Sequence, residues 1–493
     1  MTSTSANRAL WLSLAAAVAF VLFRSFVFAC YEQNFDSDQA IVGLMAKHLS
    51  EFRAFPLFFY GQNYMLGVEA WIAVPFFWLG GPTVPMLRLP LVVLNVAVVV
   101  LAIRLLVANG LTPALALVAV LPIAACGPIP SAQLLTALGA SVEPLVYVIV
   151  LWLLRDHPAA FGVFLCVASL HREFTIFALA PVLLFQWLER RAIRWPALAT
   201  SAAAFGVTWV AIDQVKRHVN IAGPGGAAAA AASGPLSQEA VQVGRLLSFH
   251  PAVYLARLHV LLAQGVPDLF GARPQTIAAG GIWGDSTVGS RLAGLALLAA
   301  VVFGVARAIG IGMRRRPRGI QFQIFLALVA LQALAAYGLH GGTLVEPRTE
   351  LNYVLLALFL PVALLGAYFQ LETNRVCRGA VVALVAAWAL VMTADNARVN
   401  REYIVSPPGS IHRILSDYLM SHRIKYAWAG YWDSYRVTFL SRERVIVAST
   451  ETVRIPGYQT RVKENAPSAA RIVRQPCSEG TRVAEWCVIS AFP

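Results

Sequence analysis

The chain has 493 residues, of which 58% are hydrophobic and only 13% are charged, whereas soluble globular domains are about 25% charged. So small a polar fraction excludes a soluble globular protein, because much of the surface must face lipid. The formal net charge is +14, but the arginines cluster at the ends of apolar runs, as in membrane proteins that keep basic loops inside. We therefore expect an integral membrane protein whose partners are membrane lipids and not nucleic acid.

Apolar runs that approach the length needed to cross a bilayer, about 20 residues, recur as far as residue 395 and predict about eleven membrane spans. The first run is interpreted as a transmembrane helix and not as a signal peptide, since no small-residue cleavage site follows it. The sequence shows no inverted or tandem repeat of the kind found in many transporters. The predicted spans are residues 9–29, 87–107, 113–130, 134–154, 159–170, 174–188, 196–212, 289–311, 320–339, 351–370 and 379–395.

The fifth and sixth runs are too short to cross a membrane vertically. We interpret them as one segment that is broken at His171, Arg172 and Glu173. An unbroken helix over residues 159–188 would reverse every later span and place the basic run 314–318 outside, against the positive-inside rule. The break is therefore preferred, and it leaves charged side chains dipped into the membrane, where they indicate function by default.

With the amino terminus inside, four hydrophilic pieces lie outside. They are a first loop at 30–86, a long loop at 213–288, a short loop at 340–350 and the tail at 396–493. Within the long loop, the glycine- and proline-rich stretch 223–235 predicts poor regular structure and hinges that can close over a site. Most of the chemically versatile side chains therefore lie on the outer face.

The tail, residues 396–493, predicts a small α/β domain outside the membrane domain of residues 1–395. Helical spacing of apolar residues covers 409–424. Cys477 and Cys487 can form a disulfide if the tail lies outside the cytoplasm. An aromatic run beginning at Tyr431 suits either a sugar-stacking surface or the core of the small domain itself. Strands are expected at 426–432, 435–440 and 444–449.

The first loop opens with two acids, Asp36 and Asp38, directly after the first span. Two carboxylates at the lip of a bilayer can act as a general base and its partner, or hold a divalent cation against a phosphate. The same residues also fit a helix cap, with Asp36 capping and Gln39 reaching back. The following apolar spacing predicts an amphipathic helix along the membrane surface, with Lys47 and His48 off its apolar face.

The residues around this motif resemble the first outer loop of the glycosyltransferase C superfamily. The similarity is to bacterial membrane proteins related to dolichyl-phosphate-mannose protein mannosyltransferases and to lipid A aminoarabinose transferase. Those loops carry an acidic Asp-Glu-Ala after the first helix and then a tyrosine–glycine–glutamine stretch that ends in glutamate–alanine. The counterparts here are Asp38-Gln39-Ala40 and the segment 60–70. Because Gln39 stands where the family often has glutamate, Asp38 is the matching acid and Asp36 its substitute.

The resemblance implies an all-α polytopic membrane protein of the glycosyltransferase C type in a bacterial inner membrane, with its active site and tail on the periplasmic side. It implies an inverting glycosyltransferase that moves a sugar from a polyprenyl-phosphate donor to an acceptor hydroxyl on a glycan, a lipid or a protein. No cofactor is implied beyond a divalent cation at the acids. Asp38 or Asp36 would deprotonate the acceptor, and Arg172 and Arg348 would bind the donor phosphate. The pocket would include Tyr60, Gln62, Tyr64, Glu69, His171 and Glu143.

Other interpretations of the same residues remain open. Arg172 can instead pair with Glu173 or extend to lipid headgroups, and Pro144 alone explains the helix start at Glu143. A transporter or flippase of a lipid-linked glycan would use the same membrane charges without making a bond. The acidic, outward-facing first loop and the lack of repeat symmetry favour the transferase. A surface protein whose tail binds glycan without catalysis is the third alternative.

Overall fold

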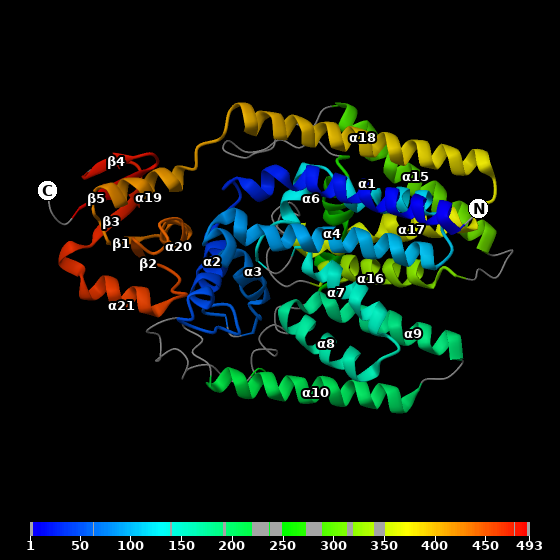
Figure 1. The fold of residues 1–493 in the computed structure, drawn as a ribbon, viewed down its shortest axis with the longest axis horizontal. Helices are drawn as coiled ribbons and strands as arrows, with labels where there is room; N and C mark the ends of the chain where they lie inside the picture. Colours follow the sequence, from blue (N-terminus) through cyan, green and yellow to red (C-terminus); the bar gives the residue numbers. More distant parts are fainter. Residues whose placement is uncertain are drawn as a thin grey trace.

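The computed structural model shows a bundle of apolar helices with a small sheet-containing domain at one end (Figure 1). The amino terminus and the connection from α17 to α18 lie at the opposite end of the bundle (Figure 1). The structure describes residues 3–62, 64–138, 141–190, 194–218, 236, 249–272, 288–312, 319–339, 351–477 and 479–490.

Each predicted span overlaps a helix. Among the described residues, six helices are long and apolar enough to cross a membrane, and the others are shorter apolar helices. The short η3 (Leu351–Leu358) leads into α17. The bundle helices are α1 (Ser3–Cys30), α4 (Val84–Ala108), α5 (Pro113–Ala124), α7 (Glu143–Leu154), α8 (Pro158–His171), α9 (Leu179–Arg190), α10 (Trp195–His218), α15 (Val288–Gly312), α16 (Gln321–Tyr337), α17 (Phe359–Leu371) and α18 (Arg375–Val405).

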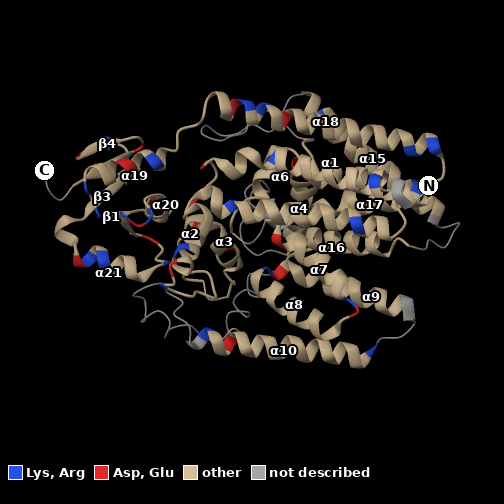
Figure 2. Ribbon diagram, in the orientation of Figure 1, with Lys and Arg blue, Asp and Glu red and all other residues tan. Residues whose placement is uncertain are grey.

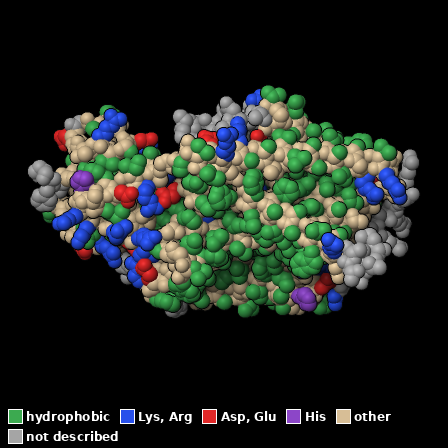
Figure 3. All heavy atoms as spheres, turned by 45° about the horizontal axis from the view of Figure 1, so that its top comes forward, with side chains coloured by type: hydrophobic (Ala, Val, Ile, Leu, Met, Phe, Trp, Pro, Cys, Tyr) green, Lys and Arg blue, Asp and Glu red, His purple; other side chains and the backbone are tan. Residues whose placement is uncertain are grey.

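The outside of the bundle is apolar, which is the reverse of a soluble protein. Large side chains such as Leu22, Phe26 and Val302 are exposed, and hydrophobic atoms cover the helical part in the space-filling view (Figure 3). Lysine, arginine and acidic residues gather near the helix ends and on the small domain (Figure 2). Because helices satisfy their own backbone hydrogen bonds, such a surface suits a lipid environment. The chain is a multi-pass membrane protein.

In two of the predicted spans the helix is shortened next to a proline. The span expected over 134–154 begins only at Glu143, where Pro144 in the first turn fits a helix start because its missing N–H is not needed there. The span expected over 113–130 ends at Ala124, and a separate short helix, α6 (Pro128–Gln133), follows it. The proline at the start of α6 explains the interruption in the same way.

The break predicted in the middle of the chain is confirmed. Helix α8 ends at His171, and Arg172 has an extended backbone with φ of −145° and ψ of 117°. A short 3-10 helix, η1 (Glu173–Ala178), then leads into α9. The unbroken helix over 159–188 is therefore wrong. The extended residue separates α8 from η1 and so interrupts the span at Arg172.

The first loop folds into two helices, α2 (Ser37–Ser50) and α3 (Val68–Gly80). The expectation of an amphipathic helix that lies along the membrane surface is wrong for α2, because Lys47 and His48, which are off its apolar face, are also buried in the protein. Helix α2 is covered by α3 on one side and by α20 (Tyr431–Leu440) of the small domain on another. Its polar residues face protein because their charge partner, Glu443, comes from the tail.

The tail forms a five-stranded sheet in the order β2-β1-β3-β5-β4. Strand β1 pairs in parallel with both β2 and β3, whereas β5 is antiparallel to β3 and β4. The helix predicted at 409–424 is confirmed as α19 (Ile411–Ser421). The elements are β1 (Tyr426–Ala429), α20, β2 (Ile446–Ser449), α21 (Pro456–Glu464), η4 (Ala466–Ser468), β3 (Ala470–Arg474), β4 (Thr481–Val483) and β5 (Trp486–Ile489).

The strand predicted at 435–440 is wrong, because this segment is part of helix α20. Parallel neighbours cannot be joined by a tight hairpin and need a crossover, usually a helix. Helix α20 supplies that crossover between β1 and β2. Local β propensity was thus overridden by the topology of the sheet.

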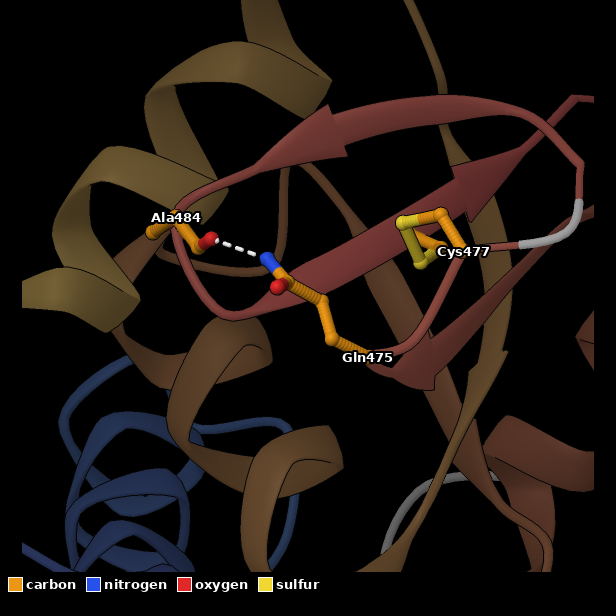
Figure 4. Close-up of a disulfide and its surroundings, with 4 residues drawn as sticks. Gln475, Cys477 and Ala484 are labelled. Atoms are coloured by element: carbon orange, nitrogen blue, oxygen red, sulfur yellow. Dashed lines mark hydrogen bonds between the residues drawn. A yellow bond between two sulfur atoms is a disulfide. The ribbon is translucent and has the colours of Figure 1, made fainter.

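Cys477 and Cys487 form a disulfide with a Cα–Cα distance of 5.5 Å. The bond joins β5 to the segment that follows β3 (Figure 4). Nearby, the side-chain amide of Gln475 donates to the carbonyl of Ala484 at 2.6 Å (Figure 4). The pairing that the spacing left open is therefore present, and it suits an oxidising compartment.

The small domain has an apolar core of its own but also shares the core of the bundle. Its own core contains Leu415, Val437 and Trp486. By contrast, Tyr435 and Phe439 of α20 belong to the same continuous cluster of buried side chains as the membrane helices. Helix α18 also continues through the boundary expected at 395/396. The tail is thus packed onto the bundle and does not hang from it as a separate unit.

The long loop expected at 213–288 contains helices where the structure describes it. These are α13 (Pro251–Val260), the π-helical turn η2 (Leu261–Gly265) and α14 (Val266–Leu269). The end of this segment packs on α18, where the indole of Trp388 donates to the carbonyl of Phe270 at 3.0 Å. The glycine- and proline-rich stretch 223–235 lies outside the described residues.

Candidate active site

The acidic motif of the first loop lies at the start of α2. Asp36 is the N-cap, and its carboxylate accepts the Gln39 N–H at 2.9 Å. Burial raises the pKa of Asp36 above its ordinary value, and the charge of Asp38 adds to this effect. The Gln39 N–H and the charge of Arg436 act in the opposite direction. The predicted capping role of Asp36 is therefore confirmed.

Asp38 faces the small domain. The hydroxyl of Tyr431, the first residue of α20, donates to its Oδ1 atom. The Nε atom of Arg454 lies 3.5 Å from the same hydroxyl, and its Nη1 atom donates to the carbonyl of Gly61 at 3.0 Å. Asp38 therefore lies where the first loop and the tail meet, with one carboxylate oxygen engaged by a side chain of the tail.

Gly61 allows this close approach between loop and tail. Its φ of +72° lies in the left-handed region, and an added Cβ would lie 3.1 Å from the Cα of Arg454. Both features make any residue larger than glycine energetically costly at this position. The guanidinium of Arg454 also lies 5.8 Å from the ring centroid of Phe59.

A second polar cluster is buried at the broken span. His171 contacts Glu69 of α3 through Nε2 at 2.9 Å and the hydroxyl of Tyr147 through Nδ1 at 2.7 Å. His171 is 1% exposed and Glu69 is 3% exposed. The segment that precedes α3 is attached to the end of α8 through the backbone, since the N–H of Leu66 donates to the carbonyl of Leu170 at 3.2 Å.

Glu143 and Arg172 complete this buried cluster. Ser141 donates to one carboxylate oxygen of Glu143 through its N–H at 3.2 Å and its hydroxyl at 2.9 Å. Arg172 donates to the carbonyl of Leu138, while Glu173 is exposed. The expected alternative of an Arg172–Glu173 pair is therefore not what the structure shows. The positive charge of Arg172 interacts electrostatically with the carboxylates of both Glu69 and Glu143.

Three polar atoms of this cluster are buried without a hydrogen-bond partner among the described residues. They are Oε1 of Glu69, Oε1 of Glu143 and Nε of Arg172. A buried polar atom that lacks a partner is expensive, and such atoms are rare in folded proteins. Two acceptors and one cationic donor within one cluster suit a ligand that carries both hydroxyls and an anionic group.

Neighbouring residues between α6 and α7 connect the two clusters. The side-chain oxygen of Gln39 accepts from the N–H of Ala137 at 3.3 Å and from Arg88 at 3.2 Å. The next residue, Leu138, receives the hydrogen bond of Arg172. The acidic motif and the broken span are thus linked through adjacent backbone groups.

The remaining predicted site residues lie elsewhere. Tyr60 is fully buried, and its hydroxyl contacts Nδ1 of His48 at 2.9 Å, away from Glu69. Tyr64 is 41% exposed, and Gln62 is half-buried in the turn before it. Arg348 lies outside the described residues.

Several residues of these clusters were not predicted from the sequence. Arg88 lies inside an apolar span, and a charge in such a place is a signal of function or structure. Tyr147 and Ser141 carry no local pattern that would mark them. Tyr431 and Arg454 are far from the first loop along the chain, so only the folded structure brings them to Asp38.

A divalent cation at Asp36 and Asp38 would need several oxygen ligands from the surrounding residues. Within the part of the chain that the structure describes, no group of three or more histidine, cysteine, aspartate or glutamate side chains could hold a metal ion. One oxygen of Asp36 accepts the Gln39 N–H and one oxygen of Asp38 accepts the Tyr431 hydroxyl. Divalent cations bind through several oxygen ligands. The cation therefore stays a prediction.

No family model matches the sequence, and no curated protein sequence matches it. Its structure is similar to that of ArnT from Cupriavidus metallidurans bound to undecaprenyl phosphate, with a TM-score of 0.62 and 10% identity over 97% of each chain. The structure of the same protein from Cupriavidus metallidurans in the apo state matches with a TM-score of 0.59 and 10% identity, over 99% of this chain and 98% of that one.

A second similar structure is the oligosaccharyltransferase from Archaeoglobus fulgidus in the apo form. It gives a TM-score of 0.51 and 11% identity, over 94% of this chain and 69% of that one. At these identities the likeness concerns the fold. The chain is therefore a multi-pass membrane protein with the glycosyltransferase C fold, as the resemblance in its first loop predicted.

Proposed function

We propose that this protein is an inverting glycosyltransferase that moves a sugar from a polyprenyl-phosphate donor to an acceptor hydroxyl outside the cytoplasm. The observation that carries the proposal is the buried cluster of Glu69, Glu143, His171 and Arg172, with its unpartnered acceptor and donor atoms. A sugar phosphate supplies the matching groups, since hydroxyls donate to carboxylates and a phosphate accepts from a guanidinium.

The donor lipid would enter from the membrane, so that its phosphate meets Arg172. An arginine binds phosphate through a planar array of donors and keeps its charge at every working pH. Arg348 is proposed as a second phosphate contact. Both would stabilise the charge that develops on the leaving polyprenyl phosphate. The carboxylates of Glu69 and Glu143 would hold the sugar through its hydroxyls.

The reaction would proceed in one displacement. Asp38 takes the proton of the acceptor hydroxyl while the acceptor oxygen attacks the anomeric carbon. The bond between that carbon and the phosphate oxygen breaks, and the polyprenyl phosphate leaves with the electron pair. Asp38 is favoured over Asp36 because Asp36 caps α2, and Asp36 remains its substitute. Attack opposite to the leaving group inverts the anomeric configuration.

The disulfide of the tail supports the proposed placement of the site. Cys477 and Cys487 are paired, and such bonds persist in oxidising compartments such as the bacterial periplasm. We therefore propose a bacterial inner membrane protein with the tail and both clusters on the periplasmic side. The acceptor would be a glycan, a lipid or a protein that reaches this face.

The proposal is tested with purified protein in detergent, radiolabelled polyprenyl-phosphate sugars and a crude envelope acceptor. Wild type would be compared with Asp38→Asn, following release of the label from the lipid. Release that depends on Asp38 supports the transferase and its base. Absence of release with every donor, together with movement of labelled lipid across proteoliposomes, would instead establish the flippase.

A further inference from the structure

Tyr431 of the small domain is joined to the acidic motif at two places. Its hydroxyl donates to the carboxylate of Asp38, and its backbone carbonyl accepts from the hydroxyl of Ser37 at 2.7 Å. The two contacted residues are neighbours in the motif. A side chain from the far end of the chain is therefore fixed against the acid that the proposed function uses as a base.

The position of Tyr431 is itself fixed by the loop that follows β2. Its N–H donates to the carboxylate of Glu451 at 3.1 Å. The guanidinium of Arg454 lies 5.9 Å from its ring centroid, with Nε 3.5 Å from its hydroxyl. Only 7% of the residue is exposed. The ring therefore has little freedom to turn away from Asp38.

The hydroxyl of Tyr431 keeps its proton at neutral pH. Burial raises the pKa of Tyr431, and the charge of Asp38 and the hydrogen bond to it raise the pKa further. The group therefore donates to the carboxylate and does not compete with it for the acceptor proton. The carboxylate of Asp38 thus accepts the hydroxyl proton of Tyr431 as a hydrogen bond through one oxygen only.

We propose that Tyr431 is a positioning residue for the transfer reaction, holding one oxygen of Asp38 so that the other faces the acceptor hydroxyl. This inference rests on the proposed function, in which Asp38 removes that proton. The proton moves from the acceptor to Asp38, the acceptor oxygen bonds to the anomeric carbon, and Tyr431 keeps its own proton throughout. The tail is thereby part of the active site, and the site is complete only when the tail is docked.

Four variants test the inference in the intact protein: Tyr431→Phe, Asp38→Asn, the double variant, and Tyr435→Phe as a control. Tyr435 lies on the same helix, but its hydroxyl accepts from the N–H groups of Arg454 and Ile455 and does not contact Asp38. Thermal midpoints in detergent identify any variant that fails to fold. The readouts are kcat and the pH profile of kcat/KM for label release.

Tyr431→Phe is expected to lower kcat about tenfold and to move the acidic limb of the profile, because a charge-assisted hydrogen bond to the base is lost. In the Asp38→Asn background, Tyr431→Phe is expected to lower kcat no further. Tyr435→Phe is expected to leave the limb in place, whatever its effect on the thermal midpoint.

The possible failures are distinguishable. Wild-type kcat and an unmoved limb in Tyr431→Phe, with transfer still lost in Asp38→Asn, would overturn the positioning role and leave the proposed function intact. An equal shift of the limb in Tyr435→Phe would also overturn it, since the effect would then come from disturbance of the domain. Full transfer by Asp38→Asn would overturn the proposed base and the inference with it.

Discussion

Lys47 in α2 forms an ion pair with Glu443, which follows α20, with 2.7 Å between Nζ and Oε2. The side chains are 9% and 7% exposed. The same carboxylate contacts His48 at 3.1 Å and accepts the hydroxyl of Tyr458 at 2.8 Å, and Arg53 also donates to it. One buried acid of the tail thus contacts three basic side chains of the first loop and one tyrosine of the tail itself.

Replacing Glu443 with glutamine should destabilise the whole protein. Removing one partner of a buried charge cluster leaves the other charges uncompensated, at a cost of about 3–5 kcal/mol. The check is the thermal midpoint of the purified protein in detergent. Glu464→Gln is the matched control, because Glu464 is exposed on α21 of the same domain. Equal midpoints for the two variants would contradict a docking role for Glu443.

The stability of the docked tail should fall as the pH falls. Burial alone would raise the pKa of Glu443, but the hydrogen bonds and charges of His48, Arg53 and Lys47 hold it well below its ordinary value. Burial lowers the pKa of His48, although Glu443 opposes this. For both groups the unfolded chain binds more protons than the folded one, so stability rises with pH.

The thermal midpoint is therefore expected to drop as the pH falls below the ordinary histidine value of 6.5, and to drop further below the ordinary glutamate value of 4.5. His48→Gln should weaken the first part of this dependence. The matched control is His422→Gln, since His422 is exposed. A pH dependence that His48→Gln leaves unchanged would show that another group controls it.

Arg172→Ala should lower the rate of label release about 100-fold, because a buried donor to the leaving phosphate would be lost. Arg172→Lys should fall between this variant and wild type, since lysine keeps the charge but not the planar array of donors. The measurement is single-turnover release from a labelled polyprenyl-phosphate sugar. Arg104→Ala, at an exposed position of α4, is the control. Wild-type rates in Arg172→Ala would remove Arg172 from the reaction.

Gly61→Ala should destabilise the contact between first loop and tail by about 1–3 kcal/mol, because alanine resists a φ of +72° and its Cβ would meet Arg454. Gly206→Ala is the matched comparison. Gly206 lies in α10 with nothing within 4 Å of an added Cβ, so alanine should stabilise the helix by up to about 1 kcal/mol. Thermal unfolding should show opposite signs, and a stabilised Gly61→Ala protein would contradict the structure.

The spans and the broken segment could be predicted from sequence because their signals are local. Apolar length marks a membrane helix, and a charged triplet such as 171–173 inside an apolar run marks a break. The same locality made Glu69 and Glu143 noticeable as acids at the ends of apolar helices. The fold class followed from these signals and from the resemblance in the first loop.

The contacts between the first loop and the tail could not be predicted in this way. Asp38 and Tyr431 are 393 residues apart, and Lys47 and Glu443 are 396 residues apart. No local pattern in a single sequence encodes such pairs. Spacing alone predicted a helix on the membrane surface with Lys47 and His48 off its apolar face, because the tail that covers these residues lies far away in the sequence. Residues 435–440 of α20 were mistaken for a strand because local β propensity does not show that β1 and β2 are parallel and need a helical crossover.

The burial of α2 by the tail has a consequence for how the chain is made. The ribosome releases α2 almost four hundred residues before Glu443, its charge partner, so Lys47 and His48 remain without it during most of synthesis. A chain that stops early would present a cationic, half-apolar helix at the membrane surface. We expect such fragments to be recognised and degraded, so that only chains that contain the tail keep a folded first loop.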